Sequence, residues 1–115
     1  MLKKPVLVTG ATGYVGGRVV PHLLEAGYKV RATGRSLEKL KTRAWSQHPN
    51  VELEFSDLLD LTSIKNAAKG CGPAYYFIHS MNSSSEDFVK TDRIAAENMV
   101  KAAEYAKLER IIYLG

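Results

Sequence analysis

The chain has 115 residues, of which 45% are hydrophobic and 24% are charged, and its formal net charge is +4. These values are ordinary for a globular domain and exclude a disordered or collagen-like chain. The length suffices for one domain with a core and leaves no room for a separate substrate domain. The one cysteine, Cys71, excludes an intrachain disulfide and a cysteine-rich metal site, so no metal site is predicted.

Short apolar runs alternate along the chain with segments of helical period. The apolar runs predict strands at residues 6–8, 29–33, 51–55, 74–78 and 111–114. The intervening segments predict helices at residues 14–26, 37–47 and 86–107, and a short one before Gly70. Ser36 is the expected N-cap of the second helix, and Asp60 or Thr62 is the expected start of the third.

The alternation of strands and helices predicts an α/β fold with a doubly wound parallel sheet, the Rossmann arrangement. Strands joined by helical crossovers run parallel, and the crossover helices cover both faces of the sheet. The runs at 6–8 and 74–78 are apolar throughout, which is typical of strands in the middle of a sheet. The run at 51–55 alternates between apolar and acidic residues, which suits an edge strand. These features favour the strand order 3-2-1-4-5.

A glycine-rich turn connects the first strand to the first helix with the spacing G-x-x-G-x-x-G. We expect Gly10 to permit the tight turn, Gly13 to let backbone N–H groups approach a diphosphate, and Gly16 to let the helix pack closely on the strand. The helix N-terminus adds unpaired N–H donors and a partial positive charge. A turn without a ligand is the alternative, but the strand–turn–helix context favours a dinucleotide site.

The segment Val8–Gly16, which reads VTGATGYVG, resembles the nucleotide-binding start of the extended and atypical short-chain dehydrogenases/reductases. The likeness continues through the segments 57–58, 79–81, 92–103 and 110–115, so it covers the whole chain. The branch that the chain resembles most is the NmrA-like or nucleoside-diphosphate-sugar-epimerase-like one. The resemblance implies an NAD(P)-binding Rossmann domain whose glycine turn binds the cofactor through Gly10, Ala11, Thr12, Gly13, Tyr14, Val15 and Gly16.

The end of the second strand favours NADP as the cofactor, with NAD as the alternative. A domain that prefers NAD usually has Asp or Glu there to bind the ribose 2′-hydroxyl. Residues 31–36 contain no acid, and Arg35 could pair with a 2′-phosphate through its planar guanidinium. Arg31 is a weaker candidate for this role, since the sequence does not show which face of the strand carries it. The alternative interpretation of Arg35 is a solvated loop charge.

By the same resemblance, two further segments contribute to the cofactor site. Asp57 and Leu58, just after the third strand, would flank the adenine, and Asp57 could also cap the following turn. His79, Ser80 and Met81, at the end of the fourth strand, would line the ribose beside the nicotinamide. A structural role is the alternative for His79.

The sequence contains none of the catalytic residues that the resemblance implies. These families transfer protons with a Tyr-x-x-x-Lys pair, in which the lysine lowers the pKa of the tyrosine. None of the six tyrosines is followed by lysine four positions later. In the family this pair follows the fifth strand. We therefore expect the chain to be the NAD(P)-binding portion of a longer reductase, epimerase or dehydratase for a small organic substrate, truncated at its C-terminal end and inactive on its own.

Two other functions stay open at this point. One is a non-enzymatic, NmrA-like, NADP-binding regulator or assembly factor. The other is nucleic-acid binding, prompted by the nine basic and two acidic residues within positions 1–43, although the third glycine of the turn has no purpose in such a site. No run approaches the roughly 20 apolar residues of a membrane span, and no signal peptide is evident, so we expect a cytoplasmic protein.

The longest predicted helix, at 86–107, carries two apolar stripes. One stripe would cover the sheet, and the other would either widen that core-facing surface or pack against a second copy of the chain in a homodimer. The first stripe comprises Phe88, Ala95, Met99, Ala102 and Ala106, and the second comprises Val89, Ala96, Val100 and Ala103.

Overall fold

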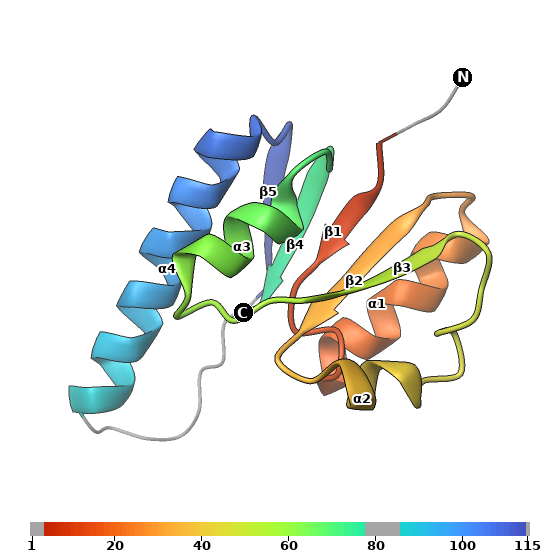
Figure 1. Cartoon of the computed structure of the whole chain (residues 1–115), viewed down its shortest axis with the longest axis horizontal. Coiled ribbons are helices and arrows are strands. Elements are labelled where there is room, and N and C mark those ends of the chain that lie inside the picture. The colour runs from red at the N-terminus through yellow and green to blue at the C-terminus, as the bar shows by residue number, and fades with distance from the viewer. Residues whose placement is uncertain (1–3, 78–85, 115) are drawn as a thin grey trace.

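The structure is a computed structural model that describes residues 4–77 and 86–114. Strands and helices alternate along the chain, as predicted (Figure 1). The strands are β1 (Val6–Val8), β2 (Val30–Gly34), β3 (Val51–Phe55), β4 (Pro73–Phe77) and β5 (Arg110–Leu114). The helices are α1 (Tyr14–Glu25), α2 (Leu37–Lys41), α3 (Leu61–Ala68) and α4 (Glu86–Ala106).

Within the described residues the strands form one parallel sheet in the order β3-β2-β1-β4-β5, which confirms the predicted fold class. Because the strands are parallel, the described loops that follow β1, β2 and β3 lie together at the carboxyl edge of the sheet (Figure 1). The connection after β1 leads to β2 on one side, and the chain later returns to β4 on the other side. Loops that diverge in this way open a crevice at the end of the central strand.

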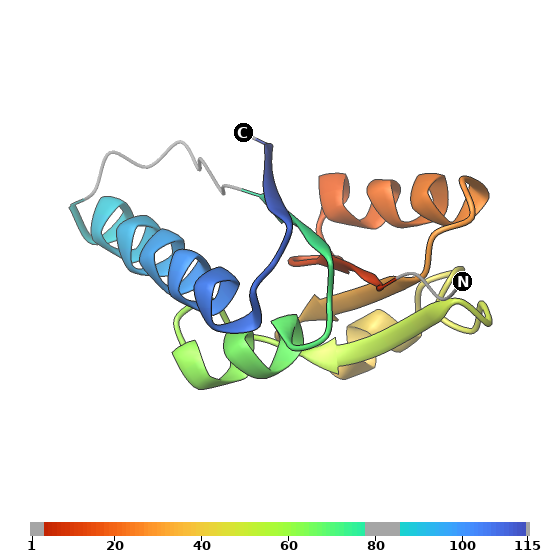
Figure 2. The same cartoon turned by 90° about the horizontal axis from the view of Figure 1, so that it is seen from above.

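Each face of the sheet has its own hydrophobic core, because side chains of a strand alternate between the faces. In β1, Leu7 points to the core that contains Ile64 and Met99, whereas Val8 points to the core that contains Val20. Helices α1 and α3 accordingly lie on opposite sides of the sheet (Figure 2).

Helix α4 buries one of its two predicted apolar stripes. Met99 and Ala102 are 1% and 0% exposed and pack in the same core as α3. Val89 and Val100 of the other stripe are 56% and 52% exposed. Packing of this second stripe against another copy of the chain stays a prediction. Among the described helices, none is long and apolar enough to cross a bilayer.

Helix α2 is shorter than the predicted helix and ends at Lys41. Its start is as predicted, since Ser36 Oγ accepts a hydrogen bond of 3.2 Å from Lys39 N–H. At the other end, Thr42 Oγ1 donates to Lys39 O at 2.7 Å, and the N–H of Arg43 bonds to the carbonyl three residues earlier instead of four. The chain therefore leaves the helical path and continues in turns toward β3.

Candidate functional site

A groove with a volume of about 650 Å³ opens at the carboxyl edge of the sheet, beyond β1, β2 and β3. The glycine turn after β1, the start of α2, the loop after β3 and the first half of α4 surround it. Doubly wound sheets bind their ligands in this crevice. The lining residues are Gly10, Thr12, Gly13, Gly34, Arg35, Ser36, Lys39, Ser56, Asp57, Leu58, Leu59, Thr91, Asp92 and Ala95.

The glycine turn has the geometry that its spacing predicts. Gly10 adopts a positive φ of 62°, which side chains other than glycine rarely accept. Gly16 lies so close to the turn that a Cβ there would be 2.4 Å from the carbonyl oxygen of Gly10. Gly13 is the N-cap of α1, and no side chain caps this helix. The N–H groups of the first helical turn therefore have no side-chain acceptor, and this turn begins at Gly13, which lines the crevice; such an arrangement suits an anion.

Buried hydroxyl groups hold the strand ends beneath the groove. Thr9 Oγ1 donates to Tyr75 O at 3.1 Å, which ties β1 to β4. Thr33 Oγ1 donates to Val8 O at 3.2 Å, which ties β2 to β1. Ser56 Oγ, just after β3, donates to Thr33 Oγ1 at 2.8 Å. These bonds fix the points from which the surrounding loops start.

The loop after β3 brings Asp57 and Leu58 to the groove, where the sequence predicted an adenine site. Asp57 Oδ1 accepts from Leu59 N–H at 2.9 Å, so the turn-capping role considered for Asp57 is present. Two buried residues that the sequence did not single out hold the loop. Asp57 N–H donates to Ser63 Oγ at 2.9 Å, and Asn98 Nδ2 of α4 donates to Leu58 O at 2.8 Å.

Two cationic side chains line the groove at the start of α2. Arg35 is the residue that the sequence predicted for this position. Lys39 was missed, although the predicted N-cap at Ser36 places it in the first helical turn, beside the end of β2. No residue from Arg31 to Ser36 is acidic.

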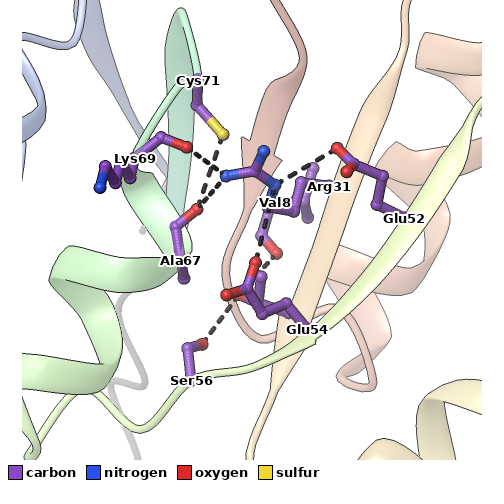
Figure 3. Close-up of polar contacts among 9 residues, drawn as sticks. Val8, Arg31, Glu52, Glu54, Ser56, Ala67, Lys69 and Cys71 are labelled. Carbon is purple, nitrogen blue, oxygen red and sulfur yellow. Dashed lines mark hydrogen bonds and ion pairs between the residues drawn. The ribbon is translucent and has the colours of Figure 1, made fainter.

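Arg31, the weaker candidate for binding a 2′-phosphate, lies elsewhere, and this part of the prediction is wrong. Its side chain is on the α3 face of the sheet and is 14% exposed. Figure 3 shows the guanidinium between the end of α3 and the edge strand β3. Nη1 donates to Ala67 O at 2.8 Å and to Lys69 O at 2.6 Å, and Nε lies 3.3 Å from Glu52 Oε1. Arg31 therefore joins α3 to the sheet and does not line the groove.

The remaining residues that were predicted to bind the cofactor differ in their exposure to solvent. Ala11 is fully buried, whereas Tyr14 and Val15 are 78% and 47% exposed at the start of α1. The Tyr14 hydroxyl accepts from Arg18 Nη1 at 2.6 Å. The segment His79, Ser80 and Met81 lies outside the described residues.

Tyr76 is a buried phenol close to Asp92, which lines the groove. Burial raises the pKa of Tyr76, and the neighbouring Tyr113 and Asp92 raise it further. A catalytic tyrosine base needs the opposite shift. Tyr76 is therefore a packing residue and not a base at neutral pH.

Cys71 is 1% exposed, and its Sγ donates to Ala67 O at 3.7 Å. Burial raises the pKa of this thiol from 9.0 to about 11, with Glu52 and Glu54 adding to the effect and Arg31 opposing it. Since the thiolate is the reactive form, we expect iodoacetamide to leave Cys71 of the folded protein unmodified at about pH 8. Mass spectrometry with and without guanidinium chloride measures this, and fast labelling of the folded chain would contradict it.

The raised pKa of Cys71 also makes the stability of the folded chain depend on pH. The folded state favours the protonated thiol, so its contribution to stability is complete below pH 9.0 and is lost as the pH rises toward about 11.

The fold, the glycine turn and the groove define a Rossmann-type domain of the short-chain dehydrogenase/reductase class. The chain belongs to the NmrA-like family, whose sequence pattern matches residues 2–115. This confirms the resemblance seen in the sequence.

Comparison with known proteins shows that the chain is similar to several reductases. The chain is 30% identical over 112 residues to cinnamoyl-CoA reductase 1 of Petunia hybrida, which covers 94% of this chain and 34% of the relative. It is 38% identical over 90 residues to dihydroflavonol 4-reductase of Hordeum vulgare, which covers 74% and 25%. The solved structure of Citrobacter sp. triphenylmethane reductase complexed with NADP(H) matches with a TM-score of 0.79 and 29% identity, over 96% of this chain and 37% of that one. The match thus covers between 25% and 37% of the length of these relatives.

Proposed function

We propose that the chain is the NADP(H)-binding part of a reductase that acts on a small organic substrate, with the catalytic groups outside these residues. The observation that carries the proposal is the groove between the glycine turn and the basic start of α2. The reductases among the relatives favour this function over that of a regulator or a nucleic-acid binder.

The residues around the groove fit a dinucleotide. A Cβ on Gly13 would lie 3.3 Å from Gly10 O, so the tight turn favours glycine here, and this residue without a side chain lines the groove at the start of α1. The backbone N–H groups of the first turn of α1 and the helix dipole would hold the diphosphate. Asp57, one of whose oxygens caps the turn, would accept from the adenine amino group with the other. The bound nicotinamide would supply the hydride, and this chain would hold and orient it.

The basic start of α2 supports NADP over NAD. Arg35 and Lys39 line the groove within one helical turn of Ser36, whose backbone begins the helix. A 2′-phosphate there would meet a planar guanidinium and an ammonium. The ribose of NAD has only a hydroxyl to offer, and no Asp or Glu is present in residues 31–36 to accept from it.

Substitution of the two cations tests the proposal. We expect Arg35→Ala and Lys39→Ala each to weaken NADP⁺ binding about tenfold, because each removes one charged contact with the 2′-phosphate. Binding of NAD⁺ should change by less than about twofold, since it lacks this group. Isothermal titration calorimetry with both cofactors measures the effect. Arg110→Ala, at the opposite end of the sheet, is the matched control, and tighter binding of NAD⁺ than of NADP⁺ by the unmodified chain would refute the proposal.

A further inference from the structure

The segment that follows α2 contacts the glycine turn through Arg43, a residue that does not itself line the groove. Arg43 Nη2 donates to Thr12 O at 2.9 Å, across 31 positions of the chain. Thr12 lies between Gly10 and Gly13 and lines the groove. The N–H of the same peptide group is held as well, since Gly13 N–H donates to Gly10 O at 3.0 Å. The peptide that joins Thr12 to Gly13 is thus hydrogen-bonded through both its carbonyl and its N–H.

A second side chain of this segment contacts α1. Trp45 Nε1 donates to Gly17 O at 3.2 Å. In a regular helix this carbonyl accepts from the N–H four residues later, but position 21 is proline, which has no N–H. The indole therefore supplies the donor that Pro21 removes.

The early end of α2 makes both contacts available. If the helix continued beyond Lys41, as the sequence pattern predicts, the backbone at 43–45 would follow the helical path. Instead, the turns after Thr42 bring Arg43 against the glycine turn and Trp45 against α1. Helix α2, whose N-cap Ser36 and first-turn residue Lys39 line the groove, is thereby connected through the segment after it to the glycine turn.

We propose that Arg43 and Trp45 are positioning residues that hold the glycine turn and the first turns of α1 and couple them to the segment that follows α2. The proposal rests on the function proposed above only for the identity of the ligand. Arg43 acts through Thr12 and not through contact with the cofactor. Its loss would therefore disturb the turn that binds the diphosphate, and NADP and NAD both contain this group. A residue that contacted the 2′-phosphate would affect NADP alone.

Hydrogen exchange of the ligand-free chain tests the coupling without any cofactor. In Arg43→Met and Trp45→Phe we expect the hydrogen-bonded amides within residues 10–17, those of Ala11, Gly13 and Gly17, to exchange about tenfold faster, while amides of α3 and β4 keep their rates. Arg43→Lys should restore part of the protection, because an ammonium can still donate to Thr12 O. Arg110→Met is the control for loss of an arginine. Unchanged exchange at 10–17, or an equal increase throughout the chain, would overturn the proposal.

Cofactor titration supplies the second readout. We expect Arg43→Met to raise the Kd for NADP⁺ and NAD⁺ by the same factor, about fivefold. A loss confined to NADP⁺ would make Arg43 a 2′-phosphate contact and overturn the positioning role. If the unmodified chain bound neither cofactor, the proposed function would fail, and the exchange rates at 10–17 would still decide whether the coupling exists.

Discussion

Replacing Gly16 by alanine is expected to lower the free energy of unfolding by about 2 kcal/mol and to weaken NADP⁺ binding more than tenfold. The added Cβ would lie 2.4 Å from Gly10 O and 3.0 Å from Gly10 C. Both are backbone atoms, so no side chain can move aside, and α1 must shift away from the turn. Overpacking of this kind costs about 3 kcal/mol, and the better helix propensity of alanine returns about 1 kcal/mol.

The matched control is Gly17→Ala, one position later in the same helix. It brings the same gain in helix propensity, and its Cβ would lie 3.1 Å from Ala11 O, a contact that a small shift can relieve. We expect its stability to stay within about 1 kcal/mol of the unmodified chain. Urea unfolding followed by the fluorescence of Trp45, the only tryptophan, measures both variants. Equal stability of the two variants would show that α1 does not depend on the contact at Gly16.

Replacing Arg31 by methionine is expected to destabilise the chain by about 3 kcal/mol. The largely buried guanidinium satisfies two carbonyls at the end of α3, Ala67 O and Lys69 O. These carbonyls also carry the negative end of the helix dipole, which a cation stabilises. Methionine fills similar space but donates nothing, and it leaves Glu52 and Glu54 facing each other without a cation.

Two further variants separate the contributions in the same urea experiment. Arg31→Lys should recover only part of the loss, because one ammonium cannot reproduce the planar set of donors. Glu52→Gln should cost less than about 0.5 kcal/mol, since the Glu52 side chain is 58% exposed and its ion pair is screened by water. If Arg31→Met unfolded at the same urea concentration as the unmodified chain, the bonds to α3 would contribute nothing to stability.

Local sequence patterns predicted the features of the fold that depend on neighbouring residues. The glycine spacing defined the turn at Gly10 and the helix–strand contact at Gly16, because both follow from a missing Cβ. Ser36 was predicted as an N-cap, and Asp60 was one of the two expected starts of the third helix; the side chains of both accept from an N–H three residues later. The strand order followed from which runs were apolar throughout.

The features that the sequence did not reveal depend on contacts between residues that are distant in the chain. The segment after the end of α2 bonds to distant residues, from Arg43 to Thr12 and from Trp45 to Gly17, and no local pattern reveals these bonds. The role of Arg31 depends on which face of β2 carries it, which is known only once Val30 and Ala32 are seen in the α1-side core. Asn98 supports Leu58 across 40 positions and looks in sequence like an ordinary polar residue of a helix.

The proline in α1 has a consequence for how this domain can change in evolution or in the laboratory. Pro21 is tolerated within the helix because the indole of Trp45 occupies the carbonyl of Gly17. A chain that loses the indole keeps a helix with an unpaired carbonyl, and a chain that loses the proline no longer needs the indole as a donor. The residues at positions 21 and 45 therefore depend on each other. Designs that alter the cofactor preference near α2 should either keep both residues or replace both.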